Sequence, residues 1–477
     1  MDALKRQRGF SILEILIAMA IAVISITGVI VAVGVFSSGT TANLSGSQSS
    51  ILAGETSSDA LLFGQRLLER ERALGREDFR LVNPFSTTST SGPLVYSAEV
   101  NVALQPEYLT KLVEISVHWL GEYGAHKNVK LTGLVGNLDN VSAPDTCNSI
   151  LSGDWSNPRT INVASIDIDP SVSTDITAAQ GKAYITGSYI GNSLDFFVVD
   201  VADAAAPYIM SSLNTGPGLN AVALAGNYAY VANRSTAGQL QVIRIADPHH
   251  PVLATSTRVV GALGVGNSIS YYNGMVYLGL TANGGGPQFV AFDVSSSTNP
   301  IRRGSLTIGH DVNAIRVKGK YAYIATPDPE ELKIYDVDDP SNMIRASGSG
   351  TLSDSTSNGK SVDVVGRTVF LGRTIGLSSS AKQLYLFDAT NAALDPLPLL
   401  GSADVDDSIN DLIVRSNFAF LSTNSELAIY SLSDTNSIAK VGSLTLSAAS
   451  SALACEGNLM YVGLANPHDT LKIIGPS

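Results

Sequence analysis

The sequence predicts a mainly β protein in which one apolar helix precedes a small α+β domain and a large repeat domain. Hydrophobic residues make up 44% of the 477-residue chain and charged residues 15%, and 43 residues are glycine, which is typical of β-rich domains. An apolar stretch occupies residues 10–36, and an aromatic-centred segment recurs seven times after residue 180. The net charge of −12 gives no general attraction for phosphate backbones, so we expect no nucleic-acid partner.

A short basic segment precedes the apolar stretch. Residues 1–9 read MDALKRQRG, and residues 10–36 read FSILEILIAMAIAVISITGVIVAVGVF, with Glu14 as their only charge. About 20 apolar residues span a bilayer, and the basic flank predicts that residues 1–9 stay cytoplasmic. A secretory signal is cut after its apolar segment, whereas the Gly9–Phe10 junction lies before it, so the helix is expected to survive processing. An ordinary signal anchor is the alternative.

The residues around this junction, RGFSILEILIAMAIA, resemble the class III leader of type IV prepilins and pseudopilins. The resemblance implies that a prepilin peptidase cuts after Gly9, that Phe10 becomes N-methylated, and that Glu14 is the fifth mature residue. A carboxylate in an apolar helix is costly and usually kept for a partner, here the α-amino group of Phe10 in a neighbouring subunit. Many major pilins carry proline where this chain has Val31, which favours a minor pilin or pseudopilin.

Residues 37–138 are predicted to continue the helix and to add a small β-sheet. The polar residues 37–50 form helices poorly, helical spacing returns over residues 51–75, and the Ser/Thr-rich residues 86–92 are expected to form a loop. Valine-rich strands follow, with a hairpin turn near residues 121–126. This combination resembles the small sheet that packs on the helix in minor pilins.

The aromatic-centred segment is the sign of a repeat fold. Its copies run from GKAYITG to GNLMYVG and are spaced by 41 to 50 residues, which fits a four-stranded propeller blade. We therefore predict a seven-bladed β-propeller over residues 158–477, joined by a linker over residues 139–157. Following strands such as LKIYDVDDP make it similar to the LVIVD-repeat propeller family. The seven marker aromatic residues are Tyr184, Tyr230, Tyr277, Tyr323, Phe370, Phe420 and Tyr461.

The two ends of the repeat domain predict how the propeller closes. Residues 158–168 read as the outermost strand of a blade, whereas the last repeat ends at residues 471–474 without such a strand. Joining the two fragments gives a 3+1 blade and hides both sheet edges. Cys455 falls at a turn on the face where the linker with Cys147 enters, so a disulfide is geometrically sensible in an oxidising compartment. Two buried free thiols are the alternative.

The repeat domain offers few candidate chemical groups. No GxSxG motif or P-loop occurs, so we predict no enzyme and no catalytic, cofactor or metal site. Asp167, Asp169 and Asp175 form an acidic loop that could hold calcium, but EF-hand spacing is missing and a solvated loop is preferred. Strand-end aspartates and several histidines are interpreted as structural or surface groups: Asp200, Asp293, Asp336, Asp388, His249, His250, His310 and His468.

The sequence thus leads us to expect a minor or tip type IV pilin-like subunit that displays its propeller for adhesion or for ligand or protein binding. The precursor would be a single-pass inner-membrane protein, and the mature protein would reach the cell surface. Expected partners are prepilin peptidase, other pilin subunits, and an unknown surface, glycan or protein. The alternatives are a minor pseudopilin of a secretion system and a membrane-tethered propeller enzyme. The candidate binding loops are residues 187–193, 280–288, 326–331 and 373–383.

Overall fold

The computed structural model divides the chain into two compact units, residues 1–137 and 138–477. The predicted leader, the apolar helix, and the residues Gly9, Phe10 and Glu14 lie outside the described part of the chain. Among the helices that are described, none is long and apolar enough to cross a bilayer. The described residues are 49–77, 82–104, 110–121, 124–136, 147, 151–188, 193–283, 285–327, 330–349, 352, 356–377 and 381–477.

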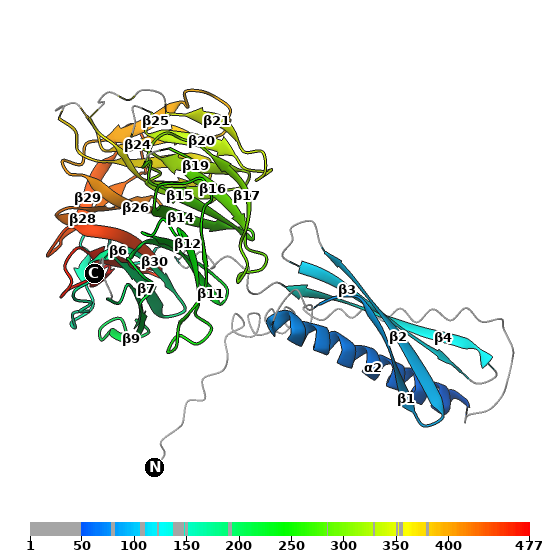
Figure 1. The fold of residues 1–477 in the computed structure, drawn as a ribbon. Helices are drawn as coiled ribbons and strands as arrows, with labels where there is room; N and C mark the ends of the chain where they lie inside the picture. Colours follow the sequence, from blue (N-terminus) through cyan, green and yellow to red (C-terminus); the bar gives the residue numbers. More distant parts are fainter. Residues whose placement is uncertain are drawn as a thin grey trace, which may run out of the picture. The chain divides into compact units, whose positions relative to one another are not determined.

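A helix packed on one face of a four-stranded sheet forms the first unit (Figure 1). Helix α2 (Ser49–Glu77) contacts strands β3 (Thr110–Leu120) and β4 (His126–Gly136), and the sheet order is β1-β2-β3-β4. Two glycines permit this close approach, because an added Cβ at Gly64 would lie 2.5 Å from Leu131 and one at Gly133 would lie 2.7 Å from Leu68. The other two strands are β1 (Phe85–Ser91) and β2 (Leu94–Leu104).

Strand β1 corrects the prediction of a loop over residues 86–92. Its residues pair with β2 from Phe85 opposite Val100 to Ser91 opposite Leu94. Gly92, with φ of 58°, takes the left-handed conformation that a tight hairpin turn requires. The Ser/Thr composition suggested a loop, but threonine is β-branched and fits a half-exposed edge strand.

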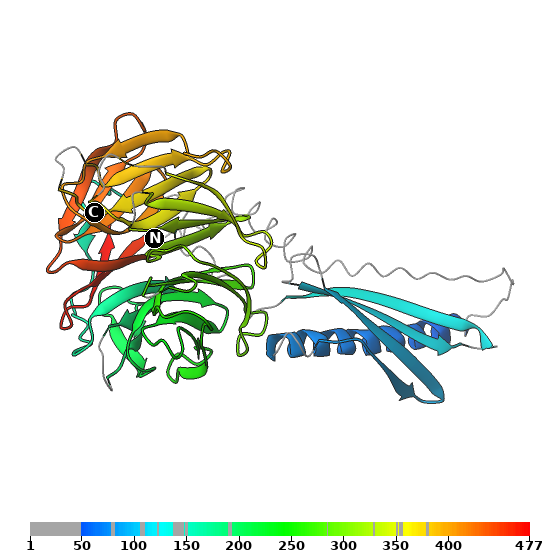
Figure 2. The ribbon, with the colours of Figure 1, turned by 45° about the horizontal axis from the view of Figure 1, so that its top comes forward.

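Seven four-stranded antiparallel sheets build the described part of the second unit. The first strand of each sheet packs against the first strand of the next, and the last packs against the first, so the sheets close into a ring. Figure 2 shows the sheets following one another around this ring. In order, the sheets are β6 (Ser173–Ala179), β7 (Lys182–Gly187), β8 (Phe196–Asp200), β9 (Tyr208–Leu213); β10 (Leu219–Ala225), β11 (Tyr228–Asn233), β12 (Leu240–Arg244), β13 (Val252–Thr257); β14 (Gly266–Tyr272), β15 (Met275–Leu280), β16 (Phe289–Asp293), β17 (Ile301–Leu306); β18 (Ala314–Lys318), β19 (Tyr321–Ala325), β20 (Leu332–Asp336), β21 (Ile344–Gly348); β22 (Gly359–Val365), β23 (Thr368–Arg373), β24 (Leu384–Asp388), β25 (Leu399–Ala403); β26 (Ile409–Arg415), β27 (Phe418–Thr423), β28 (Glu426–Ser431), β29 (Ala439–Thr445); and β30 (Ser450–Glu456), β31 (Leu459–Leu464), β32 (Leu471–Gly475), β5 (Arg159–Thr160).

The last of these sheets joins the two ends of the unit, as the sequence predicted. Its outermost strand is β5, which pairs with β32 through Thr160 opposite Ile474 and Arg159 opposite Gly475. The strand is much shorter than the predicted residues 158–168. The side chain of Asn162 ends it by taking over the pairing: its Nδ2 donates to Leu471 O at 3.1 Å, and its Oδ1 accepts from Ile473 N at 2.8 Å.

The segment before β5, which we call the strap (residues 147 and 151–157), is fastened to the same sheet. A disulfide joins Cys147 to Cys455, with Cα atoms 5.2 Å apart. The side chain of Asn458 makes two hydrogen bonds, at 2.9 and 3.0 Å, with the backbone of Ser152. Buried Trp155 packs edge-to-face on Phe420, with ring centroids 4.9 Å apart. The strap thus reinforces a closure that has only two paired residues in β5.

Polar side chains on the first strands link neighbouring sheets. Asp175 accepts the backbone N–H of Ile176 through one oxygen and that of Val222, in the next sheet, through the other, both at 2.8 Å. Burial raises the pKa of Asp175 to about 7, and repulsion by Asp411 adds to the rise. Asp363 accepts the backbone N–H groups of Val364 and Val414 in the same way, and Asp411 accepts those of Leu412 and Leu453. At three other positions an asparagine makes the link by donating to a backbone carbonyl of the next sheet or of the loop before it: Asn220 to Gly266, Asn267 to Val312 and Asn313 to Gly359.

Replacing Asp175 by asparagine should change how stability depends on pH. The folded protein keeps the Asp175 proton up to about pH 7, whereas the unfolded chain releases it near the ordinary pKa of 3.8. The contribution of Asp175 to stability is therefore largest below about pH 4 and falls as the pH rises towards 7. In thermal unfolding from about pH 5 to about pH 8, the Tm advantage of the wild type over Asp175→Asn should shrink with rising pH.

Asp388→Asn is the matched control for this series. Hydrogen bonds from Thr390 hold the pKa of Asp388 below its ordinary value, so this carboxylate stays ionised across the whole pH range tested. Its Tm difference from the wild type should remain constant. Parallel Tm curves for Asp175→Asn and the wild type would contradict the assignment of a raised pKa to Asp175.

Breaking the disulfide should lower the unfolding temperature. The bridge joins residues 308 positions apart, and the chain-entropy model allows roughly 5 kcal/mol for so long a loop. Cys147→Ser should therefore unfold at lower temperature than the wild type in a circular dichroism melt. Dithiothreitol should lower the Tm of the wild type to that of the variant and leave the variant unchanged; a wild type that does not respond to the reductant rules out the crosslink as a stabilising element.

Candidate functional site

The first strands of the seven sheets surround a central channel. Its volume is about 840 Å³, and residues of all seven first strands line it, together with Cys147 of the strap. Ligand pockets in proteins commonly have volumes of roughly 300–1,000 Å³, so the channel is large enough for a small molecule. The channel is therefore the candidate site in this part of the chain.

One side of the channel carries its positive charges. Arg316 and Lys318 lie on β18, Lys360 lies on β22, and Arg415 lies on β26, so the four cations among the described lining residues come from three consecutive sheets. We call these residues the cationic wall. The other four first strands present mainly small side chains to the channel, among them Thr177, Ala178, Ala221, Ser268, Ala452 and Ala454.

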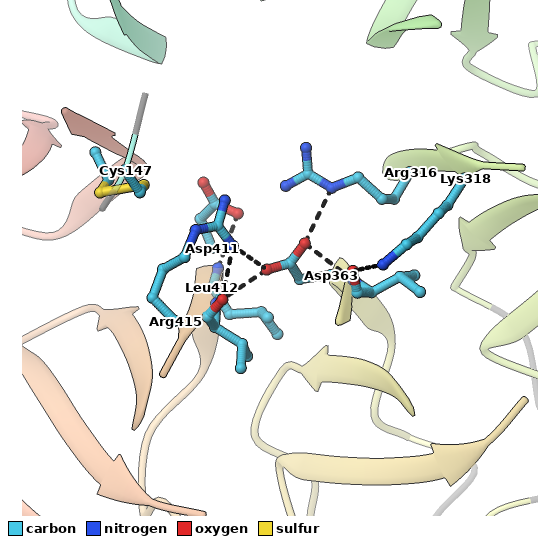
Figure 3. Close-up of polar contacts among 10 residues, drawn as sticks. Cys147, Arg316, Lys318, Asp363, Asp411, Leu412 and Arg415 are labelled. Carbon is cyan, nitrogen blue, oxygen red and sulfur yellow. Dashed lines mark hydrogen bonds and ion pairs between the residues drawn. A yellow bond between two sulfur atoms is a disulfide. The ribbon is translucent and has the colours of Figure 1, made fainter. Parts of the chain in front are cut away.

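Asp363 lies between the two arginines of the cationic wall (Figure 3). Its Oδ1 is 3.1 Å from Arg316 Nε and its Oδ2 is 3.5 Å from Arg415 Nη1, and its side chain is only 4% exposed. The backbone N–H groups of Val364 and Val414 donate to the same carboxylate. Asp363 thus both links two sheets and fixes the direction of the Arg316 side chain, whose terminal nitrogens point away from it.

The charge of the channel depends on pH through Asp175 and Asp411. Burial raises the pKa of Asp175 to about 7 and that of Asp411 to about 6. As the pH falls from about 7 to about 5, both carboxylates take up protons and the channel becomes more positive. Because each of their oxygens already accepts a backbone N–H, these carboxylates are directed at the seams between sheets.

The structure corrects the predicted acidic loop of Asp167, Asp169 and Asp175. Asp175 lies within strand β6, where backbone groups occupy both of its oxygens, and not in a loop with Asp167 and Asp169. Oδ2 of Asp167 instead lies 3.1 Å from Nδ1 of the exposed His468. Among the described residues, no group of three or more His, Cys, Asp or Glu side chains could hold a metal ion.

The strand-end aspartates have the structural role that the sequence indicated. Each accepts the backbone N–H of the residue two positions later, at 2.8 to 3.1 Å. His250 is exposed and lies 2.8 Å from Asp247 Oδ2 within one turn, next to His249, and His310 is exposed before β18. The aspartates are Asp200, Asp293, Asp336 and Asp388. The candidate binding loops are only partly described, because residues 189–192, 284, 328–329 and 378–380 lie outside the described part.

Sequence reasoning missed the cationic wall, the carboxylate of Asp363 that contacts it, and the seam aspartates Asp175 and Asp411. A usable signal was present, because Asp175 and Asp411 each lie nine residues before their marker aromatic residue. Arg316 and Asp363 each lie seven residues before theirs. Aligning the repeats on the marker aromatics would have placed each pair at one level of the channel.

Comparisons with known proteins found two sequence-motif matches and several similar solved structures. Residues 4–37 match the prokaryotic N-terminal methylation motif, and residues 220–259 and 309–348 match the LVIVD repeat. The WD40 β-propeller domain of Doa1 is similar with a TM-score of 0.50 and 12% identity, covering 69% of this chain and 98% of that one. The N-terminal domain of Nup159 gives a TM-score of 0.43 and 11% identity, covering 70% and 99%. No protein of curated function matches the sequence.

The likeness to the Doa1 domain concerns the fold alone, and it supports a β-propeller for the second unit. The two motif matches confirm the resemblances found in the sequence at both parts of the chain. This protein therefore carries a prepilin-like N-terminal methylation motif followed by a β-propeller that contains LVIVD repeats.

Proposed function

We propose that this protein is a minor or tip subunit of a type IV pilus-like filament and that it displays a seven-bladed propeller outside the cell for adhesion or for ligand or protein binding. The observation that carries the proposal is the presence of the methylation motif at residues 4–37 on the same chain as the closed ring of sheets. The motif supports membrane insertion and filament assembly. The ring supplies a rigid domain whose loops and channel can bind.

Size favours a sparse or terminal position in the filament. Packed helices lie about 8–10 Å apart, whereas a compact domain as large as the second unit, residues 138–477, has a radius of gyration of about 20 Å. Such a domain on every subunit would clash with its neighbours if the subunits stacked at helix-packing distances. A subunit that is rare, or that lies at the tip, avoids this clash.

Processing and assembly follow from the N-terminal residues in this proposal. Prepilin peptidase cuts between Gly9 and Phe10 in the inner membrane, and Phe10 is methylated. Glu14 then pairs with the α-amino group of Phe10 in the neighbouring subunit, because an unpaired carboxylate is unfavourable in an apolar surrounding. The small helix-and-sheet unit and the linker connect this helix to the propeller.

Mass spectrometry of sheared surface filaments tests the proposal. We expect an N-terminal peptide that begins at methylated Phe10 in the filament fraction. Glu14→Leu should still be cleaved but should be lost from the filaments, because the charge that pairs with the neighbouring subunit is gone. Glu99→Gln, which changes an exposed carboxylate on β2, is the control and should assemble normally.

Two results would overturn the proposal in different ways. An uncleaved Met1 terminus found only in membranes would mean that the N-terminus is a simple anchor. A cleaved protein that is needed for protein secretion while long surface pili form without it would identify a minor pseudopilin of a secretion system. Filaments that incorporate Glu14→Leu as well as the control would remove the assembly role of Glu14.

A further inference from the structure

The strap crosses the turns between the first and second strands of the last two sheets. Leu151 N donates to Ser416 Oγ at 3.1 Å, in the turn between β26 and β27. The side chain of Asn458, in the turn between β30 and β31, makes hydrogen bonds of 2.9 and 3.0 Å with the backbone of Ser152. The strap is therefore attached to two sheets before the chain reaches β5.

The disulfide attaches the strap to a first strand of the ring. Cys455 lies in β30, which pairs with β31 from Ser450 to Glu456. The same strand contacts the first strands of both neighbouring sheets, β6 and β26. It has seven residues, whereas β5 has two. A pull on the chain before Cys147 is thus transmitted to a strand that is paired over a greater length than β5.

Apolar contacts fix the strap between the disulfide and β5. Trp155 is buried and packs edge-to-face on Phe420 of β27. Gly153 lies against the C-terminal end of the chain, because a Cβ added to this glycine would be 2.6 Å from Pro476. Pulling the strap away must therefore expose apolar surface to water, which is unfavourable, in addition to breaking hydrogen bonds.

We propose that the strap and its disulfide form a mechanical clamp, which carries tension applied on the N-terminal side of Cys147 into the last two sheets and relieves β5 of it. A single hydrogen bond contributes little on its own, so the resistance of a strand depends on how many contacts are loaded at the same time. The clamp loads β30, the two turns and Trp155 together. The proposal rests on the proposed function only for the source of the tension, which is the filament.

Single-molecule force spectroscopy on the full-length protein in mild detergent tests the clamp. One handle is attached to the N-terminus, and the other to an azide-bearing amino acid in place of Leu377, which is 91% exposed in the loop between β23 and β24. We expect the force that opens the propeller to fall about twofold or more with dithiothreitol or in Cys147→Ser, because only the non-covalent contacts remain.

The length of the opening step identifies it. At about 3.3–3.6 Å per residue, the reduced protein gains roughly 800 Å between residues 147 and 377. The crosslink to Cys455 limits the oxidised protein to roughly 270 Å between residues 377 and 455. The extension of the first unit, which lies outside the crosslinked segment, should be the same in both states.

Two controls separate the clamp from a general loss of stability. In the reduced protein, Asn458→Ala removes the hydrogen bonds to Ser152 and should lower the opening force further. Asn417→Ala changes an exposed asparagine in the turn between β26 and β27 and should leave the force unchanged. When the handles are on the C-terminus and at residue 377, β32 leaves its sheet before Cys455 is loaded, so the force of this first step should not respond to dithiothreitol.

Three results would overturn the clamp. Equal opening forces in the oxidised and reduced protein would show that the disulfide does not carry the tension. A step of roughly 800 Å in the wild type without reductant would show that the crosslink is absent. A C-terminal first step that weakens equally on reduction would show a general loss of stability. Because all measurements use the isolated protein, a clamp found in a protein that never enters filaments would contradict only the proposed function.

Discussion

The architecture of the second unit depends on closure of the ring between its first and last sheets. Each sheet buries apolar side chains against its two neighbours, and the core at the closing seam joins Ile176 and Ile185 to Ala454 and Tyr461. Opening that seam would expose both faces to water, at roughly 25 cal/mol per Å² of apolar surface. Because β5 contributes only two paired residues, the disulfide and the side chain of Asn162 add to the attachment of this end of the chain to the last sheet.

The side chains that link neighbouring sheets lie on the first strands, which also line the channel. A residue at such a position can therefore either link two sheets or present its polar group to the channel. An aspartate at such a position accepts N–H groups from two sheets but must be desolvated, which is reflected in the raised pKa of Asp175 and Asp411. An asparagine links the sheets without carrying charge into the channel. Lys360 lies at the position where other repeats have a linking asparagine, and its charged side chain lines the channel. A position that departs from its repeats is where a functional requirement is best sought.

Local periodicity made much of this fold predictable from the sequence. The spacing of Tyr184 and its six counterparts predicted the repeat, and the unmatched ends predicted the 3+1 sheet that the structure contains. Strand β1 was missed because its Ser/Thr composition resembles that of a loop. The channel was missed because Arg316 and Asp363 lie on different sheets, and only the ring brings them within 3.1 Å. The prediction of one acidic loop was wrong for a related reason, since proximity in sequence concealed that Asp175 belongs to strand β6.

In the proposed role, the strap also decides how the propeller withstands tension. A domain that binds a surface from a filament is pulled through the chain that precedes it, and that pull reaches Cys147 before β5. The disulfide passes it to β30, which pairs with β31 from Ser450 to Glu456, so the two-residue strand is bypassed. Hydrogen bonds of a short edge strand would open one after another under such a load, whereas a covalent bond does not. The crosslink at the entrance of the propeller is therefore better suited to a tethered, load-carrying domain than to a freely diffusing one.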